Sequence, residues 1–86
     1  MLKVIKMSAE WCAPCKALEP VFNKVKDSFP DVEFEHYDKD DFPDKATFYQ
    51  VRSVPMLVFE KDGTVVDTIV GLVKQSTIED KINELK

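Results

Sequence analysis

Two cysteines separated by two residues are the part of this sequence best suited to chemistry. They stand in the segment Trp11-Cys12-Ala13-Pro14-Cys15-Lys16, where a strand is expected to turn into a helix. Unpaired N–H groups and the positive dipole end at a helix N-terminus stabilise a thiolate, which lowers a cysteine pKa from about 8.5 toward about 7 or below. The spacing predicts dithiol–disulfide exchange, with Cys12 as the nucleophile, Cys15 as the resolving cysteine and Pro14 fixing the turn between them.

A metal site is the first alternative for the cysteine pair. Zinc takes four ligands in structural sites, and His36 is the only other soft donor in the chain. A site within one chain therefore has too few ligands, and only a cluster shared between chains stays open. The acidic stretch from Asp38 to Asp44 lacks the ligand spacing and the glycine of a calcium loop, so we expect a solvated loop there. We expect no metal, and no cofactor other than the Cys12–Cys15 disulfide itself.

The elements that must position the cysteines follow from the hydrophobic pattern. A strand over 2–7 leads into the cysteine segment, and an apolar stripe at three- and four-residue steps then predicts a helix over 14–29. The elements expected further along are a strand over 32–38, a short helix from Pro43 to about Gln50, strands over 54–59 and 64–70, and a last helix with a capping box made by Ser76 and Glu79.

The order of these elements predicts how they are arranged. The first strand, helix and second strand form a parallel crossover unit, and Lys61-Asp62-Gly63 makes the last two strands a hairpin because Asp-Gly tolerates positive φ angles. The order βαβαββα therefore predicts an α/β fold, a four-stranded mixed sheet flanked by three helices. With 86 residues, 44% of them hydrophobic, the chain is expected to form one globular domain over 1–86.

Charge and hydropathy argue against several classes of function. Twelve Lys and Arg residues against sixteen Asp and Glu residues give a net charge of −4, and no basic run reaches three residues. We therefore expect no nucleic-acid partner. No apolar run approaches the roughly 18 residues of a membrane span, and the opening MLKVIKM is too short and too charged for a signal peptide. These patterns predict a cytoplasmic protein without a membrane partner, and the small size and acidic surface favour a monomer.

The segment from Ala9 to Lys16 resembles the active-site segment of the thioredoxin family, which usually reads AEWCGPCK; Ala13 stands where glycine is commoner. The resemblance covers most of the chain. Further residues at the family's spacings are Asp40, Pro43, Tyr49, Arg52, Val54-Pro55, Gly63 and Val70-Gly71. It implies a thioredoxin-like fold in a shortened form, because the family usually begins with a further strand and helix, and an architecture close to that of glutaredoxins.

The resemblance also implies roles for residues around the cysteines. Pro55 should follow a cis peptide bond beside the pair, keeping metal ions off the thiols and turning the Val54 backbone outward to pair with an extended substrate strand. A proline at the first residues of a strand agrees with its missing N–H. Trp11 should form a contact surface for the substrate. Gly71 should let a substrate approach, although it can equally serve the turn into the last helix.

Two positions depart from the family's pattern. Lys6 stands where thioredoxins carry an aspartate that helps deprotonate the second cysteine, and His36 stands where they carry a nearby lysine. A buried lysine favours its neutral form, and a charged one stabilises neighbouring thiolates. Lys6 is therefore a candidate for tuning the cysteine pKa values. The alternative is that Lys6 extends into solvent and that His36 is a surface residue of an edge strand.

By resemblance, the expected function is that of a thioredoxin-type protein disulfide reductase that serves electron transport and cell redox homeostasis. Its partners would be disulfide-containing proteins and a flavin- or iron–sulfur-dependent reductase of the thioredoxin reductase type. Ala-Pro between the cysteines favours a potential nearer about −270 mV than about −120 mV. One alternative is a glutathione-linked, glutaredoxin-like reductase, although the chain lacks a Cys-Pro-Tyr-Cys motif. Another is a redox-independent accessory subunit that binds a partner protein.

Overall fold

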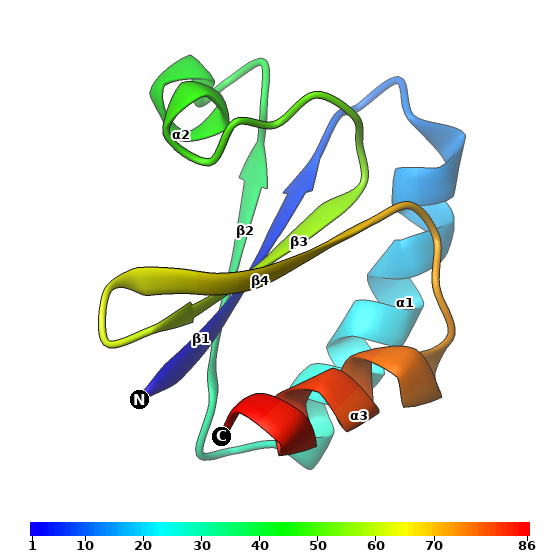
Figure 1. Ribbon diagram of the computed structural model, residues 1–86. Helices are drawn as coiled ribbons and strands as arrows, with labels where there is room; N and C mark the ends of the chain where they lie inside the picture. Colours follow the sequence, from blue (N-terminus) through cyan, green and yellow to red (C-terminus); the bar gives the residue numbers. More distant parts are fainter.

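The computed structural model describes residues 1–86, arranged as four strands and three helices in the order predicted (Figure 1). The elements are β1 (Leu2–Ser8), α1 (Ala13–Ser28), β2 (Glu33–Asp38), α2 (Pro43–Phe48), β3 (Met56–Lys61), β4 (Thr64–Val70) and α3 (Gln75–Leu85). No helix is both long enough and apolar enough to cross a membrane.

The four strands form one mixed sheet in the order β2-β1-β3-β4, which confirms the predicted architecture. β1 and β2 are parallel, with α1 as the crossover between them, whereas β1–β3 and β3–β4 are antiparallel. Asp62 and Gly63 join β3 to β4 with φ angles of 52° and 84°, which is the tight turn predicted for Asp-Gly. In the parallel pair, Lys6 of β1 lies opposite His36 of β2.

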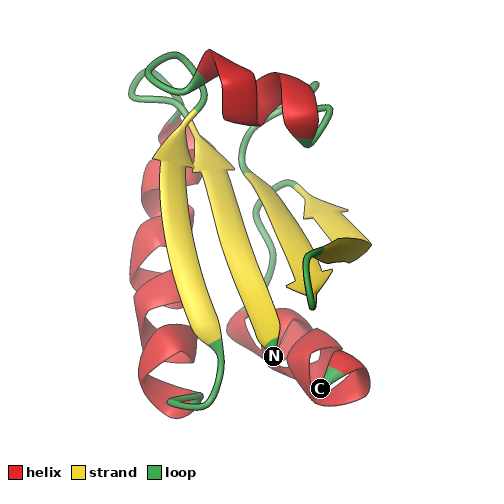
Figure 2. Ribbon diagram, turned by 90° about the vertical axis from the view of Figure 1, so that its left-hand side faces the viewer, coloured by secondary structure: helices red, strands yellow, loops and turns green.

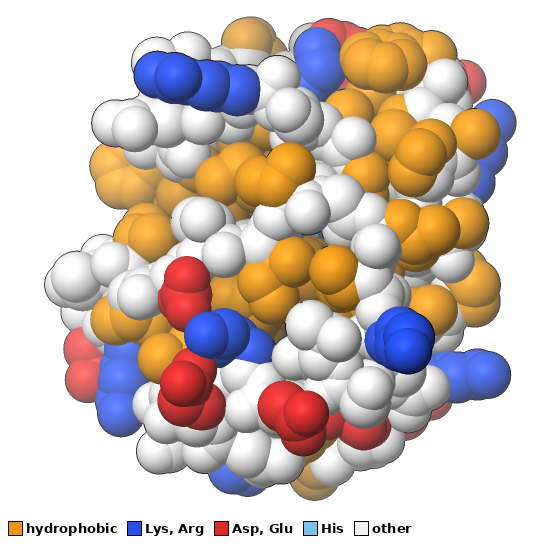
Figure 3. Space-filling view, turned by 45° about the vertical axis from the view of Figure 1, so that its right-hand side comes forward, with side chains coloured by type: hydrophobic (Ala, Val, Ile, Leu, Met, Phe, Trp, Pro, Cys, Tyr) orange, Lys and Arg blue, Asp and Glu red, His pale blue; other side chains and the backbone are white.

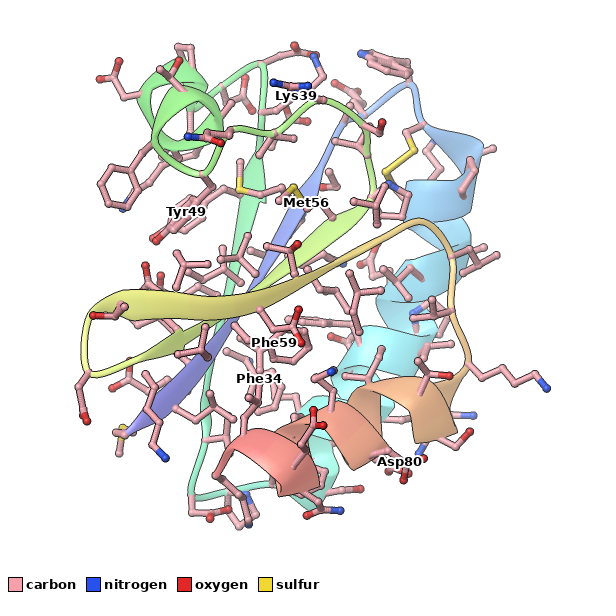
Figure 4. The ribbon with its side chains drawn as sticks, in the orientation of Figure 1. Phe34, Lys39, Tyr49, Met56, Phe59 and Asp80 are labelled. Carbon is pink, nitrogen blue, oxygen red and sulfur yellow. A yellow bond between two sulfur atoms is a disulfide. The ribbon has the colours of Figure 1, made fainter.

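Alternation along the strands builds a separate apolar layer on each face of the sheet. On one face, Leu2 and Val4 of β1 join the larger core cluster with apolar residues of α1 and α3. On the other, Ile5 and Met7 pack with Met56, Val58 and residues of α2 and the segment after it. Figures 1 and 2 show α2 apart from the other two helices, and Figure 4 shows Tyr49 and Met56 on the α2 side of the structure. Lys6 follows Val4 by two residues and therefore faces α1.

Several predicted boundaries shift by one or two residues. α2 ends at Phe48 rather than near Gln50, because Gln50 has a left-handed backbone with φ 55° that a helix cannot continue. β3 begins at Met56 rather than Val54, because Pro55 has no N–H to donate to a neighbouring strand.

The predicted capping box of the last helix is wrong. α3 begins at Gln75, and its N-cap is Lys74, which has an extended backbone and no side-chain cap bond. Ser76 already lies in the first helical turn, so its hydroxyl does not occupy the capping position. The Glu79 carboxylate instead accepts a hydrogen bond from the side chain of Gln75 at 3.1 Å.

Candidate active site

The two cysteines lie where β1 gives way to α1, at one end of the sheet. Cys12 is the N-cap of α1 with an extended backbone, and Cys15 lies in the first turn of the helix after Pro14. A disulfide joins them across a Cα–Cα distance of 5.3 Å (Figure 4). Both cysteines are 4% exposed and form a small apolar cluster with Ala9. The sequence therefore places a disulfide at a helix N-terminus, just beneath the surface.

The backbone around Cys12 favours a negative charge on its sulfur. The amide N–H of Cys15 points at Cys12 Sγ, with N and S 3.2 Å apart. This N–H is one of the groups that the first turn of a helix leaves without a carbonyl partner. An N–H donor and the positive end of the helix dipole both stabilise a thiolate relative to a thiol. Once the disulfide is reduced, Cys12 is therefore the sulfur that the fold prepares as an anion.

The segment before β3 and the residue after β4 lie beside the cysteines. The Val54–Pro55 peptide bond is cis, the geometry that the resemblance implies. The Val54 carbonyl oxygen lies 3.7 Å from Cys12 Sγ, and the Val54 side chain packs against the cysteine cluster. The Gly71 N–H donates a hydrogen bond to the Pro55 carbonyl at 2.8 Å. Cys12, Val54, Pro55 and Gly71, which are far apart in the sequence, thus meet at one place.

Gly71 is explained by its backbone angle rather than by a lack of space. Its φ of 98° lies in the region that residues with a Cβ rarely adopt. A Cβ built on Gly71 would meet no atom within 4 Å. The positive φ suits a turn before α3, and the open space leaves room over Gly71. The approach of a substrate at Gly71 stays a prediction.

Trp11 stands at the surface directly before Cys12. Its side chain is 68% exposed, and its indole Nε1 donates a hydrogen bond to Asp40 Oδ2 at 3.0 Å. Lys39 Nζ lies 5.4 Å from the indole ring centroid and pairs with Asp40 at 2.9 Å. The hydrogen bonds from Lys39 and Trp11 hold the pKa of Asp40 below its usual value, and the bond from Lys39 has the larger effect. Asp40 therefore fixes the position of Trp11, a role that sequence reasoning missed, although Asp40 belongs to the set that carried the resemblance.

Exposed apolar side chains surround this end of the molecule. Val70 and Leu72 flank Gly71 and are 57% and 53% exposed, and Trp11 is exposed beside the cysteines. Figure 3 shows apolar side chains gathered along the upper right of the face that it presents. Together with half-buried Val54, these residues form an apolar rim around the nearly buried disulfide.

A polar cavity of about 300 Å³ lies on the other side of Cys15, between α1 and the parallel strands. The residues that line it are Lys6, Ser8, Ala9, Glu10, Cys15, Lys16, Glu19, His36 and Asp38. The structure therefore brings both positions that depart from the family's pattern, Lys6 and His36, into the cavity that Cys15 borders.

The Lys6 side chain is covered by protein along most of its length, and its ammonium ends in the cavity. Its residue surface is 2% exposed, because β1 is an inner strand of the sheet and the side chain points beneath α1. Its ammonium lies 5.0 Å from the centroid of the Phe22 ring. Burial lowers the pKa of Lys6, and the negative charge of Glu19 offsets part of that shift.

His36 is exposed on the outer strand β2, as the alternative reading expected, but its ring also points into the cavity. Its Nε2 lies 2.7 Å from the hydroxyl oxygen of Ser8, which is 7% exposed. Two effects lower the pKa of His36: the larger is burial, and the smaller is the positive charge of Lys6. The charges of Glu19 and Asp38 raise this pKa. The His36 ring therefore favours its neutral form.

Comparison with known proteins agrees with this geometry. The family model described as Thioredoxin matches residues 1–84. Thioredoxin H2 of Arabidopsis thaliana is 36% identical over 85 residues, which cover 99% of this chain and 63% of that protein. Mitochondrial thioredoxin 3 of Saccharomyces cerevisiae, in its oxidized form, superposes with a TM-score of 0.91 at 36% identity, covering 98% of this chain and 78% of that one.

A second solved structure concerns the thiol-resolving mechanism of yeast mitochondrial 1-Cys peroxiredoxin via glutathione/thioredoxin systems. It matches with a TM-score of 0.92 and 34% identity, over 98% of this chain and 78% of that chain. The present chain spans less than two thirds of the length of Arabidopsis thioredoxin H2. The match to the family model nevertheless runs through nearly all 86 residues, from β1 to the last turn of α3. This chain belongs to the thioredoxin family.

Proposed function

We propose that this protein is a thiol–disulfide oxidoreductase that reduces disulfides in other proteins. The observation that carries the proposal is the Cys12–Cys15 disulfide at the N-terminus of α1, with the Cys15 N–H directed at Cys12 Sγ. A disulfide that served only to stabilise the fold would have no need of a donor aimed at one of its sulfurs. It also closes a loop too short to constrain the unfolded chain strongly.

The reaction transfers two electrons from the dithiol to the substrate. The Cys12 thiolate attacks one sulfur of the substrate disulfide; a Cys12–substrate bond forms, and the other substrate sulfur leaves as a thiolate that takes a proton from water. Cys15 then gives its proton to solvent and attacks Cys12 Sγ. The Cys12–Cys15 bond forms, the mixed disulfide breaks, and the second substrate sulfur leaves as a thiolate that takes a proton from water. The protein ends oxidised and the substrate ends as a dithiol.

The apolar rim is the surface on which we place the substrate. An extended peptide lying over Val54 finds a backbone N–H that makes no backbone hydrogen bond within the protein. Trp11, Val70 and Leu72 offer apolar contact on either side of the cysteines. Backbone pairing together with apolar contact recognises an unfolded or looped segment without requiring one sequence. Proteins carrying an exposed disulfide are thus the proposed substrate class.

The reduced state must be restored by a second dithiol, and we place a thioredoxin reductase-type enzyme in that role, with no bound cofactor in this chain. The peroxiredoxin study among the structural relatives supports thiol peroxidases as one kind of partner for proteins of this fold. A reducing role suits a compartment in which thiols are kept reduced, and we place the protein in the cytoplasm as a monomer.

The test is a redox titration of the Cys12–Cys15 pair in dithiothreitol buffers, followed by the fluorescence of Trp11, the only tryptophan. A single two-electron transition between about −270 and −230 mV supports a reductant, and a midpoint above about −180 mV contradicts it. Reduction of a protein disulfide by the dithiol form, with a reductase or with glutathione as the electron source, then separates the thioredoxin-type role from the glutaredoxin-type role.

A second candidate is a partner-binding module in which the cysteines are secondary. The observation in its favour is the apolar rim, because exposed apolar residues gathered at one end of a small protein often mark a binding surface. Replacing both Cys12 and Cys15 with serine separates the two functions. Disulfide reduction must vanish in that variant, whereas binding of a partner through Trp11, Val70 and Leu72 must persist if it is independent of redox chemistry.

A further inference from the structure

The Lys6 side chain is covered by protein along its length, and its ammonium ends in the polar cavity without a counter-ion. Its residue surface is 2% exposed, and its Nζ takes part in none of the ion pairs or side-chain hydrogen bonds of the protein. The Phe22 ring, 5.0 Å away, is its one close favourable contact. A cation with reduced hydration attracts a negative charge that forms close to it. The ammonium therefore favours an anion among the groups that line the same cavity.

The surroundings of Lys6 Nζ narrow the choice of counter-ion. The groups that face the cavity are Ser8 on β1, Glu10 in the connection to α1, Cys15, Lys16 and Glu19 on α1, and His36 and Asp38 on β2. Glu19 favours the charged form of Lys6, but it is exposed and makes no ion pair with Lys6. His36 and Lys16 are basic. Among these groups, Cys15 is the one that gains a charge when the disulfide is reduced.

We propose that the Lys6 ammonium is the counter-ion of the Cys15 thiolate, so that this chain prepares its resolving cysteine with a cation in the cavity that both residues line. The proposal rests on the oxidoreductase function, in which Cys15 must lose its proton before it attacks Cys12. In the oxidised protein the sulfur of Cys15 is neutral and Lys6 lacks a partner. On reduction the Cys15 proton leaves to solvent through the polar cavity, and the thiolate that remains faces Lys6.

The two cysteines are stabilised by different groups in this arrangement. Cys12 has the helix N-terminus, with the Cys15 N–H at 3.2 Å, and does not line the cavity. Cys15 lines the cavity but lies within the first helical turn, past the N-cap position. Removing the charge of Lys6 should therefore act mainly on Cys15. A general loss of positive charge would act on both cysteines alike.

The test measures the pKa of each cysteine in the reduced protein, by NMR of Cβ carbons labelled in cysteine. The Lys6→Met variant keeps the length of the side chain and removes its charge. Lys26→Met removes the same charge from an exposed position near the far end of α1 and serves as the control. An opposite charge nearby lowers a pKa by about 1 to 3 units, so Lys6→Met should raise the pKa of Cys15 by at least about one unit, a tenfold loss of thiolate at a given pH.

In Lys26→Met both cysteine pKa values should stay within about 0.3 units of the parent protein, because exposed charges beyond a Debye length are screened. An unchanged Cys15 pKa in a folded Lys6→Met protein overturns the proposal. So does a shift of equal size at Cys12 and Cys15, because it would show a general field rather than a paired charge.

A second measurement needs no variant and holds even if Lys6→Met fails to fold. Coupling between two titrating groups is reciprocal, so a Cys15 thiolate must raise the pKa of Lys6 by as much as Lys6 lowers the pKa of Cys15. The Cε resonance of Lys6 should therefore titrate at higher pH in the dithiol protein, above the titration of the thiols, than in the disulfide protein. Equal pKa values in the two redox states would rule out the pairing.

These measurements are independent of the proposed function, because dithiothreitol sets the redox state and no substrate protein is present. A protein that shows the Lys6–Cys15 coupling but does not reduce protein disulfides contradicts the oxidoreductase proposal alone. A protein that reduces disulfides but shows no coupling contradicts only the role of Lys6. A purely structural Lys6 would change the free energy of unfolding and leave the cysteine pKa values unmoved.

Discussion

The amide of Gly71 donates a hydrogen bond to the carbonyl of Pro55 at 2.8 Å, which joins the end of β4 to the residue before β3. Val54, which precedes Pro55, has its carbonyl oxygen 3.7 Å from Cys12 Sγ. The bond thus connects the positive-φ turn after β4 to the backbone that lies over the reactive sulfur. A change in the conformation of Gly71 should therefore alter the substrate surface without touching the cysteines.

Gly71→Ala should lower both stability and reactivity toward protein substrates. The φ of 98° is strained for alanine and should cost about 1 to 2 kcal/mol in the free energy of unfolding, although the added methyl group meets no neighbour. Urea unfolding measures the first effect and kcat/KM for a protein disulfide measures the second. Gly71→Asn is the matched control, because asparagine tolerates positive φ better and should recover part of the stability. Equal stability of the alanine variant and the parent would contradict the argument.

Asp40→Ala should release Trp11 and weaken substrate binding. The Asp40 carboxylate holds the indole N–H at 3.0 Å, so its loss should raise the mobility of Trp11, read as lower fluorescence anisotropy. We expect kcat/KM for a protein disulfide to fall about threefold to tenfold, the range of one hydrogen bond, with the redox potential unchanged. Asp41→Ala removes a neighbouring acidic side chain that makes no hydrogen bond to Trp11 and should leave both quantities as they are. A shifted potential in Asp40→Ala would show that Asp40 acts on the sulfurs directly.

The fold and the cysteine pair were predictable from sequence because both depend on local patterns. Three local patterns each specify one element: the apolar run of β1, the helical stripe of α1 and the Asp-Gly turn. A Cys-x-x-Cys segment at a strand–helix junction places its two sulfurs close together at the helix N-terminus. The boundary errors came from residues whose backbone angles depend on context. Ser76 matched a capping pattern, yet α3 begins at Gln75 because Lys74 adopts the extended conformation that ends the connection.

The polar cavity depends on contacts between residues that are far apart in the chain, so no local sequence pattern predicts it. Lys6 and His36 stand thirty positions apart, and only the parallel register of β1 and β2 places them side by side under α1. A lysine within an apolar strand pattern reads equally well as exposed or buried. The Lys6 side chain is covered because α1 packs over that face of the sheet.

Tyr49→Phe should destabilise the protein without changing its redox chemistry. The Tyr49 hydroxyl donates a hydrogen bond to Glu60 at 2.7 Å, and Glu60 is 7% exposed. Removing the donor leaves a buried carboxylate with an unmet acceptor, which should cost about 1 to 3 kcal/mol in the free energy of unfolding. Tyr37→Phe removes a similar bond to Glu35 in a more open position and should cost less than about 0.5 kcal/mol. Equal losses in the two variants would show that burial of Glu60 is not the cause.

The stability of the protein should fall as pH drops through the titration of His36. The folded state lowers the pKa of His36 below its ordinary value of 6.5, so the unfolded chain binds the proton more readily. Stability is therefore greatest above pH 6.5 and declines as the pH falls below that value toward the folded pKa. Urea unfolding between about pH 5 and 7, above the usual range of carboxylates, isolates this group. The His36→Gln variant should lose this slope, and a slope that survives in it would assign the effect to another residue.

Lys6→Met should make the oxidised protein more stable at neutral pH. Burial lowers the pKa of Lys6, which means that folding disfavours its charged form. The variant loses a cation–π contact with Phe22 of about 0.5 to 1 kcal/mol, but a methionine sulfur near an aromatic ring restores part of it. We therefore expect a higher free energy of unfolding for the variant than for the parent protein. The unfolded form of the parent protein binds more protons than its folded form does. The destabilisation caused by Lys6 therefore shrinks as the pH rises toward the pKa of an unfolded lysine, and the free energies of unfolding of the parent and the variant should converge there. Lys26→Met, at an exposed site, should change stability by less than about 0.5 kcal/mol. A less stable Lys6→Met protein at neutral pH would mean that the ammonium already has adequate compensation in the disulfide state, and that it does not wait for the Cys15 thiolate.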